Sequence, residues 1–173
     1  IELLSDKIIN SDNPLLLLGD RISHSKSHQE IIEFAEKTGS WVYSATTSEI
    51  NFPLDHPQYL GTFPNLLSKA QQKIKKHDLV ISVGTNVFDG FFYMRGQLFD
   101  NDTFHAHIDS SASTIGRNEK TDLGIISDPK SALIDLNLEL NKKMDGEIKE
   151  KISLRKKEIQ IQTVAIKKEE KNT

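Results

Sequence analysis

The sequence has no cysteine among its 173 residues, which excludes disulfides, thiolate catalysis and Cys-ligated metal sites. No apolar run approaches the ~18 residues of a membrane span, and the N-terminus lacks the basic, apolar and small-residue order of a signal peptide. Positive and negative side chains nearly balance, because the formal net charge is −3. This balance gives no electrostatic reason for a nucleic-acid or membrane partner. We therefore expect a soluble, cytoplasmic protein with neither partner.

Several catalytic and phosphate-binding motifs are also absent. The chain contains neither the dinucleotide fingerprint G-x-G-x-x-G nor the Walker pattern, and no G-x-S-x-G elbow nominates a nucleophile. His24 and His28 are four residues apart, but no Glu stands between them as in the zinc proteases. His105 and His107 should project from the same side of a strand, with one of them hydrogen-bonded in the core. We predict no catalytic residue and no metal ligand.

What the sequence does contain is an alternation of buried strands and amphipathic helices. Strands are expected at 15–19, 40–44, 78–84, 104–109 and 123–127, and helices at 2–10, 27–39, 65–76 and 128–143. The stretch "TTSEINFPLDHPQYLGTFP", residues 46–64, is expected to be an irregular loop. Strand–helix–strand order favours right-handed parallel crossovers. We predict an α/β fold: a three-layer, Rossmann-like open sheet, mostly parallel, of about six strands with helices on both faces.

The helix boundaries carry recognisable signals. Ser27 and Glu30 have the spacing of a capping box, and Gly39 is placed to end the same helix. Asp128 is placed to cap the 128–143 helix, with Pro129 at its first position. These signals indicate where two of the predicted helices start and where one of them stops.

The last thirty residues differ from the rest, so we divide the chain at 143/144. Residues 141–173 hold ten Lys or Arg and six Asp or Glu. Ile152, Ile159 and Ile166 recur every seven residues, which indicates a narrow apolar seam on a helix. The favoured interpretation is a basic, solvated linker or helical extension that folds only against another domain.

Several predicted strands end in glycine or an acid followed by small polar residues, in "LLGDR", "SVGT", "HIDSS" and "ISDP". In a parallel sheet these ends share one edge, where open α/β folds bind ligands. Arg21 could pair with a phosphate, and Asp109 could accept from a ribose hydroxyl. Two alternatives stay open: the glycines only make tight turns, and Arg21 pairs with Asp20 or Glu30. The candidate nucleotide-binding residues are Gly19, Asp20, Arg21, Gly84, Thr85, Asp109 and Ser110.

Four stretches in order resemble the central domain of thiamine-diphosphate-dependent enzymes. They are "FPLDHPQYLG", "HDLVISVGTNVF", "HIDSSASTIGRN" and "DLGIISDPKSALIDL", and the resemblance spans Asp12 to Leu140. That group includes acetolactate synthase, benzoylformate decarboxylase, pyruvate oxidase and oxalyl-CoA decarboxylase. Each stretch is weak alone, whereas four in sequence are fairly specific.

The resemblance implies a role without catalysis for this chain. In the family, thiamine diphosphate lies between two other domains: one supplies a Glu to the pyrimidine, and the other holds the diphosphate through magnesium with a G-D-G…N motif. Neither is visible here, and the chain starts at Ile1 without Met, so we expect a fragment. The implied parent is a 2-keto acid decarboxylase or carboligase (a lyase or transferase), a homodimer or homotetramer. Its pyrimidine- and diphosphate-binding domains would be this chain's partners, with residues 144–173 leading toward the latter.

Whether the domain binds a nucleotide is left open by the resemblance. The central domain binds FAD in acetolactate synthase and pyruvate oxidase, an ADP-like nucleotide in oxalyl-CoA decarboxylase, and no cofactor in the benzoylformate decarboxylase branch. This chain has "GTFP" and "GTNVFDGFF" where flavin binders of the acetolactate synthase branch have "GMHG"-like and "GVRFDDR" stretches. One alternative is a free-standing module that binds ADP, FAD or a CoA ester. A sirtuin-like NAD enzyme ranks last, because the zinc-ribbon cysteines and a catalytic His motif are missing.

Overall fold

A computed structural model describes residues 1–45, 49–87 and 96–171, with side chains up to residue 166. Six strands form one sheet in the order β3-β2-β1-β4-β5-β6, and every neighbouring pair is parallel. The strands are β1 Pro14–Leu18, β2 Trp41–Ser44, β3 Tyr59–Thr62, β4 Leu79–Val83, β5 Phe104–Asp109 and β6 Leu123–Ile126. The predicted fold class is confirmed, and the sheet is wholly rather than mostly parallel.

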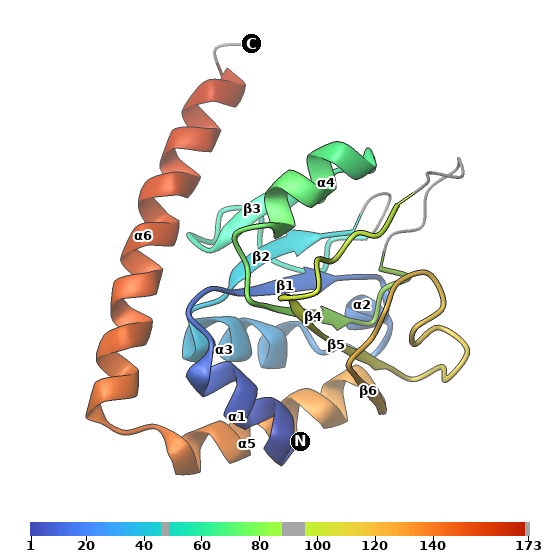
Figure 1. Cartoon of the computed structure of the whole chain (residues 1–173). Coiled ribbons are helices and arrows are strands. Elements are labelled where there is room, and N and C mark those ends of the chain that lie inside the picture. The colour runs from blue at the N-terminus through green and yellow to red at the C-terminus, as the bar shows by residue number, and fades with distance from the viewer. Residues whose placement is uncertain (46–48, 88–95, 172–173) are drawn as a thin grey trace.

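The helices cover both faces of the sheet, so each face has its own core. They are α1 Glu2–Asn10, α2 Arg21–His24, α3 His28–Thr38, α4 Leu67–Ile74, α5 Pro129–Lys143 and α6 Gly146–Lys171. Helices α1, α3 and α5 lie on one face and α4 on the other (Figure 1). Alternate residues of β1 follow this division: Leu16 and Leu18 join the first core, and Leu15 and Leu17 join the second. This burial on both faces explains why β1 is continuously apolar.

The prediction for residues 46–64 is wrong in one respect, because this segment contains β3. Tyr59 and Thr62 pair with Val42 and Ser44 of β2, and the register shifts between the two pairs. The strand has only four residues and includes Gly61, at φ +97°. Only two of its four residues are apolar, and prolines lie on either side of it, so the signals of a loop outweighed those of a strand. Residues 46–48 of this segment lie outside the described residues.

The helix signals are confirmed in two cases and wrong in one. Gly39 ends α3 with φ +60°, and the Asp128 side chain accepts a hydrogen bond from the Ser131 amide at the start of α5. Ser27 is the N-cap residue of α3, but its hydroxyl donates to the Ile22 carbonyl and caps nothing. The predicted capping box with Glu30 is therefore not formed, because a turn contact replaces it.

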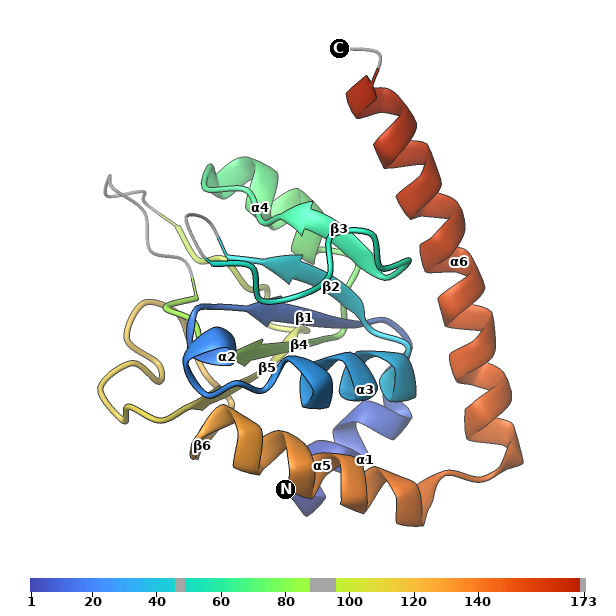
Figure 2. The same cartoon turned by 180° about the vertical axis from the view of Figure 1, so that it is seen from behind.

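Helix α6 runs along one end of the molecule, across the amino ends of the strands (Figures 1 and 2). Arg155 Nη1 donates to the Thr38 carbonyl at 3.1 Å, and Thr163 Oγ1 donates to the Pro57 carbonyl at 2.9 Å. Ile159 is fully buried in the second core, and Ile152 is also buried. The apolar seam is confirmed as a surface that packs against the chain's own core, and the extension toward another domain stays a prediction. Its sequence did not show that the seam matches a surface of the chain's own sheet.

No helix in the described part of the chain is long and apolar enough to cross a membrane. The long helix α6 carries too many charges for that role.

We expect Ile159→Ala to destabilise the protein by about 2–4 kcal/mol, because it removes fully buried methyl groups and leaves a cavity under α6. Urea denaturation followed by circular dichroism measures the change. The matched control is Ile161→Ala on the same helix, where the side chain is 71% exposed and a change within about 0.5 kcal/mol is expected. Equal effects of the two variants would contradict the docking of α6.

Candidate functional site

The candidate site lies where the order of strands along the chain reverses direction. After β1 the chain moves outward to β2 and β3, and it then returns to β4 on the other side of β1. The carboxyl ends of β1 and β4 flank this switch point, which is the usual ligand position in open α/β sheets. The structure brings all seven predicted residues to this edge, since they follow or end β1, β4 and β5.

The two glycines of the site pack against each other's turns. The Gly19 amide donates to the Val83 carbonyl at 3.1 Å, and the Arg21 amide donates to the Gly84 carbonyl at 3.2 Å. A Cβ on Gly19 would lie 2.4 Å from the Gly84 carbonyl oxygen, and one on Gly84 would lie 2.8 Å from Arg21 Cβ. Gly84 also has φ +62°. Close packing of the β1 and β4 turns therefore accounts for both glycines.

An ion pair between Arg21 and Asp109 crosses this edge. Asp109 Oδ2 lies 2.5 Å from Arg21 Nη2 and 2.6 Å from Arg21 Nε. The Asp109 side chain is fully buried, and that of Arg21 is 26% exposed. The expected alternatives for Arg21 are wrong: Asp20 accepts from the Glu49 amide, and Glu30 pairs with Lys130. Arg21 and Asp109 are 88 positions apart, so no local spacing could have revealed the pair.

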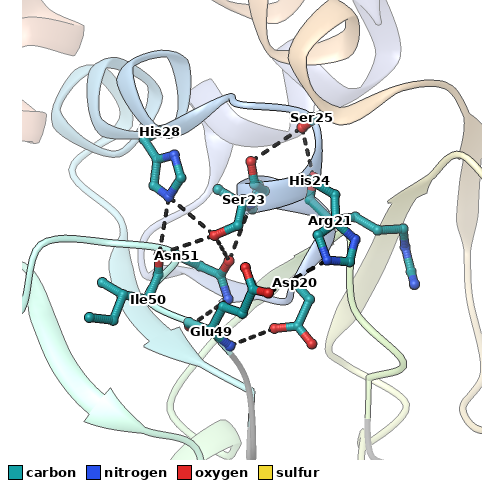
Figure 3. Close-up of polar contacts among 10 residues, drawn as sticks. Asp20, Arg21, Ser23, His24, Ser25, His28, Glu49, Ile50 and Asn51 are labelled. Atoms are coloured by element: carbon teal, nitrogen blue, oxygen red, sulfur yellow. Dashed lines mark hydrogen bonds and ion pairs between the residues drawn. The ribbon is translucent and has the colours of Figure 1, made fainter.

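The turn after β1 is fastened to residues 49–51, as Figure 3 shows. Asp20 Oδ1 accepts from the Glu49 amide at 2.7 Å, and Ser23 Oγ donates to Asn51 Oδ1 at 3.0 Å. His28 Nε2 lies 3.0 Å from the Ile50 carbonyl, to which only a protonated nitrogen can bond. That nitrogen is thus a donor and cannot act as the base for Ser23, which lies 3.3 Å away. This cluster is structural, and no pattern in the sequence indicated it.

Both histidines of β5, His105 and His107, occupy hydrogen-bonded core positions, whereas the sequence predicted this for only one of them. His105 Nδ1 donates to the Lys120 carbonyl at 2.8 Å, which leaves Nε2 to accept from Ser82 Oγ at 2.9 Å. Burial lowers the pKa of His105 to about 4, so the ring is neutral at pH 7. His107 Nε2 donates to the Thr85 carbonyl at 2.9 Å, and the two rings are 5.7 Å apart on the same side of β5. Ser82 is fully buried, which excludes it as a nucleophile.

The described residues contain no group of three or more side chains suited to hold a metal ion. A pocket beside His107 offers about 210 Å³ of empty space, part of it open to solvent, and its lining includes Asn86, Arg117 and Glu119. Because this volume includes open solvent, the enclosed part is far smaller, about the size of one water molecule. Thr85 is buried and Ser110 is exposed, so of these two only Ser110 is open to a ligand.

Comparison with known proteins adds the decisive observation: residues 1–136 match the family model described as "Thiamine pyrophosphate enzyme, central domain". The chain belongs to this family. It is 28% identical over 131 residues to acetolactate synthase from Mycobacterium leprae, covering 75% of this chain and 21% of that protein. It is 30% identical over 87 residues to benzoylformate decarboxylase from Pseudomonas aeruginosa, covering 49% and 16%.

A solved structure shares the fold. The crystal structure of benzoylformate decarboxylase from Polynucleobacter necessarius superposes with a TM-score of 0.71 at 27% identity, covering 79% of this chain and 26% of that one. The chain therefore spans only about a quarter or less of the length of these relatives. Helix α6 lies beyond the residues that the family model matches.

The residues at the switch point do not fit the phosphates of a nucleotide cofactor. The charged groups of Arg21 and Asp109 already bond to each other, and each glycine faces the opposite turn instead of open space. Part of the comparison with flavin-binding sequences also involves residues 88–92, which lie outside the described residues. The described geometry therefore favours neither FAD nor ADP.

We expect the free energy of unfolding to fall as the pH drops from about 6.5 to about 4, because His105 binds its proton in the unfolded chain first. Because the pKa of His105 is lower in the folded protein than in the unfolded chain, its contribution to the free energy of unfolding is complete above pH 6.5. That contribution is lost as the pH falls toward 4. Each such histidine contributes up to about 1.4 kcal/mol per pH unit in this window. His77, whose pKa burial also lowers to about 4, acts in the same direction.

Urea denaturation between pH 4 and pH 7 tests this for His105→Asn, whose amide can still donate to the Lys120 carbonyl. The slope of stability against pH should become shallower in this variant. His24→Asn, at an exposed position, is the control and should keep the original slope. An unchanged slope in His105→Asn would show that His105 is not the neutral core group described.

Proposed function

We propose that this chain is the non-catalytic central domain of a thiamine-diphosphate-dependent 2-keto acid decarboxylase or acetolactate synthase-like carboligase. The observation that carries the proposal is the family match over residues 1–136, in a chain whose described polar clusters serve its own fold. Relatives named acetolactate synthase and benzoylformate decarboxylase support the substrate class. The parent would be cytoplasmic.

The role that suits such a domain is to position its neighbours. The sheet is closed on both faces by helices, and α6 is attached to the amino ends of the strands through Arg155 and Thr163. Residues 144–173 would lead to the diphosphate-binding domain. Thiamine diphosphate and magnesium would be held by the pyrimidine- and diphosphate-binding domains of the parent, a homodimer or homotetramer. No step of the reaction is assigned to this chain.

The second candidate, a free-standing nucleotide-binding module, lacks a favouring observation. Its expected phosphate-binding groups are the ones that bond to each other across the switch point.

The proposal predicts that the 173-residue chain binds no thiamine diphosphate and releases no CO₂ from 2-keto acids. Isothermal titration with thiamine diphosphate and Mg²⁺ measures binding, and CO₂ release from pyruvate and benzoylformate measures turnover. The protein made from the longest reading frame that contains these residues should bind the cofactor and decarboxylate a 2-keto acid, because it would supply the other domains.

Turnover by the 173-residue chain alone would overturn the non-catalytic role. A longest reading frame that encodes no further domain would overturn the assignment to a multidomain enzyme. Purified benzoylformate decarboxylase serves as the positive control for both assays.

A further inference from the structure

The strongest feature without a role in the proposed function is the ion pair at the switch point of the sheet. We propose that the Arg21–Asp109 ion pair takes the place of a bound nucleotide, so that the carboxyl edge is closed by the chain's own charges. The proposal concerns this edge alone and does not depend on the reaction of the parent enzyme.

Asp109 has little capacity left for a ligand. Its Oδ2 accepts from Arg21 Nε and Nη2, and its Oδ1 accepts from the Ser111 amide at 2.8 Å. A carboxylate has about four acceptor positions, and three are in use here. The side chain is also fully buried, so a ribose hydroxyl cannot reach the remaining position without moving Arg21.

Arg21 is equally committed. Its guanidinium is neutralised by Asp109, and Nη2 also lies 3.3 Å from Asn86 Oδ1 in the turn after β4. A phosphate that captured this guanidinium would leave Asp109 buried without its partner, which is strongly unfavourable. The phosphate would also approach Asp20, whose carboxylate belongs to the same turn and accepts from the Glu49 amide.

The backbone supports the same conclusion. Nucleotide-binding α/β domains use glycine at this turn so that a phosphate can come close to the main chain. Here the space beside Gly19 is filled by Gly84 and Thr85, whose nearest atoms would lie 2.4 and 2.5 Å from a Cβ at that position. The glycine is therefore needed for turn-to-turn packing. The ion pair adds a further link, from the turn after β1 to the end of β5.

Thermal denaturation of the wild-type chain with FAD and with ADP, each at about 1 mM, tests the closed edge directly. We expect no shift of the melting temperature. A ligand at 100 times its Kd would raise it by roughly 5–10 °C. Such a shift, abolished by Arg21→Met, would overturn the proposal and make Arg21 a ligand-binding residue.

A double-mutant cycle tests the ion pair itself, with Arg21→Met, Asp109→Asn and both together. Each single variant should lower the melting temperature by about 5–15 °C, because each leaves one charge without its partner. The double variant should lose clearly less than the sum. The control cycle uses the surface pair Lys142→Met and Glu139→Gln, in which the Lys142 side chain is 71% exposed, and additive and small effects are expected. Additive losses for Arg21 and Asp109 would show that the two charges do not close the edge as a pair.

Discussion

The close contact between the turns after β1 and β4 is the constraint on which the rest of the structure depends. The chain reverses its direction of travel across the sheet here, and the two central strands must end side by side. Gly19 and Gly84 allow this approach because neither carries a side chain between the turns. The Arg21–Asp109 pair then extends the contact to β5, so three strands are held together at one edge.

Features that arise from the local sequence pattern were predicted correctly. Features that depend on contacts between residues far apart in the chain were missed. Five strands were predicted correctly, and the continuous apolar run of β1 reflects its burial on both faces. The seven edge residues were also found, since the ends of parallel strands meet. In contrast, β3 was missed because it is short, only half apolar and set among prolines, and the partner of Arg21 was missed because it lies 88 positions away. The core position of Ile159 likewise depends on a surface made by other segments.

Both faces and both strand ends of the sheet are covered, each by a different kind of contact. Helices close both faces with apolar contacts, α6 closes the amino edge with a mixture of apolar and hydrogen-bonded contacts, and charges close the carboxyl edge. The buried histidines contribute to this closure, because each satisfies backbone groups within the core.

The anchoring of α6 by Arg155 has a mechanical consequence. The guanidinium binds the carbonyl end of α3, and the helix continues for sixteen residues beyond Arg155 to Lys171. The helix is also held at Ile159, in the second core, and at Thr163, which donates to the Pro57 carbonyl. The eight residues after Thr163 span about 12 Å at about 1.5 Å per residue, so a tilt of about 5° at Thr163 moves Lys171 by only about 1 Å. The spaced contacts of α6 together fix the direction in which its carboxyl end points.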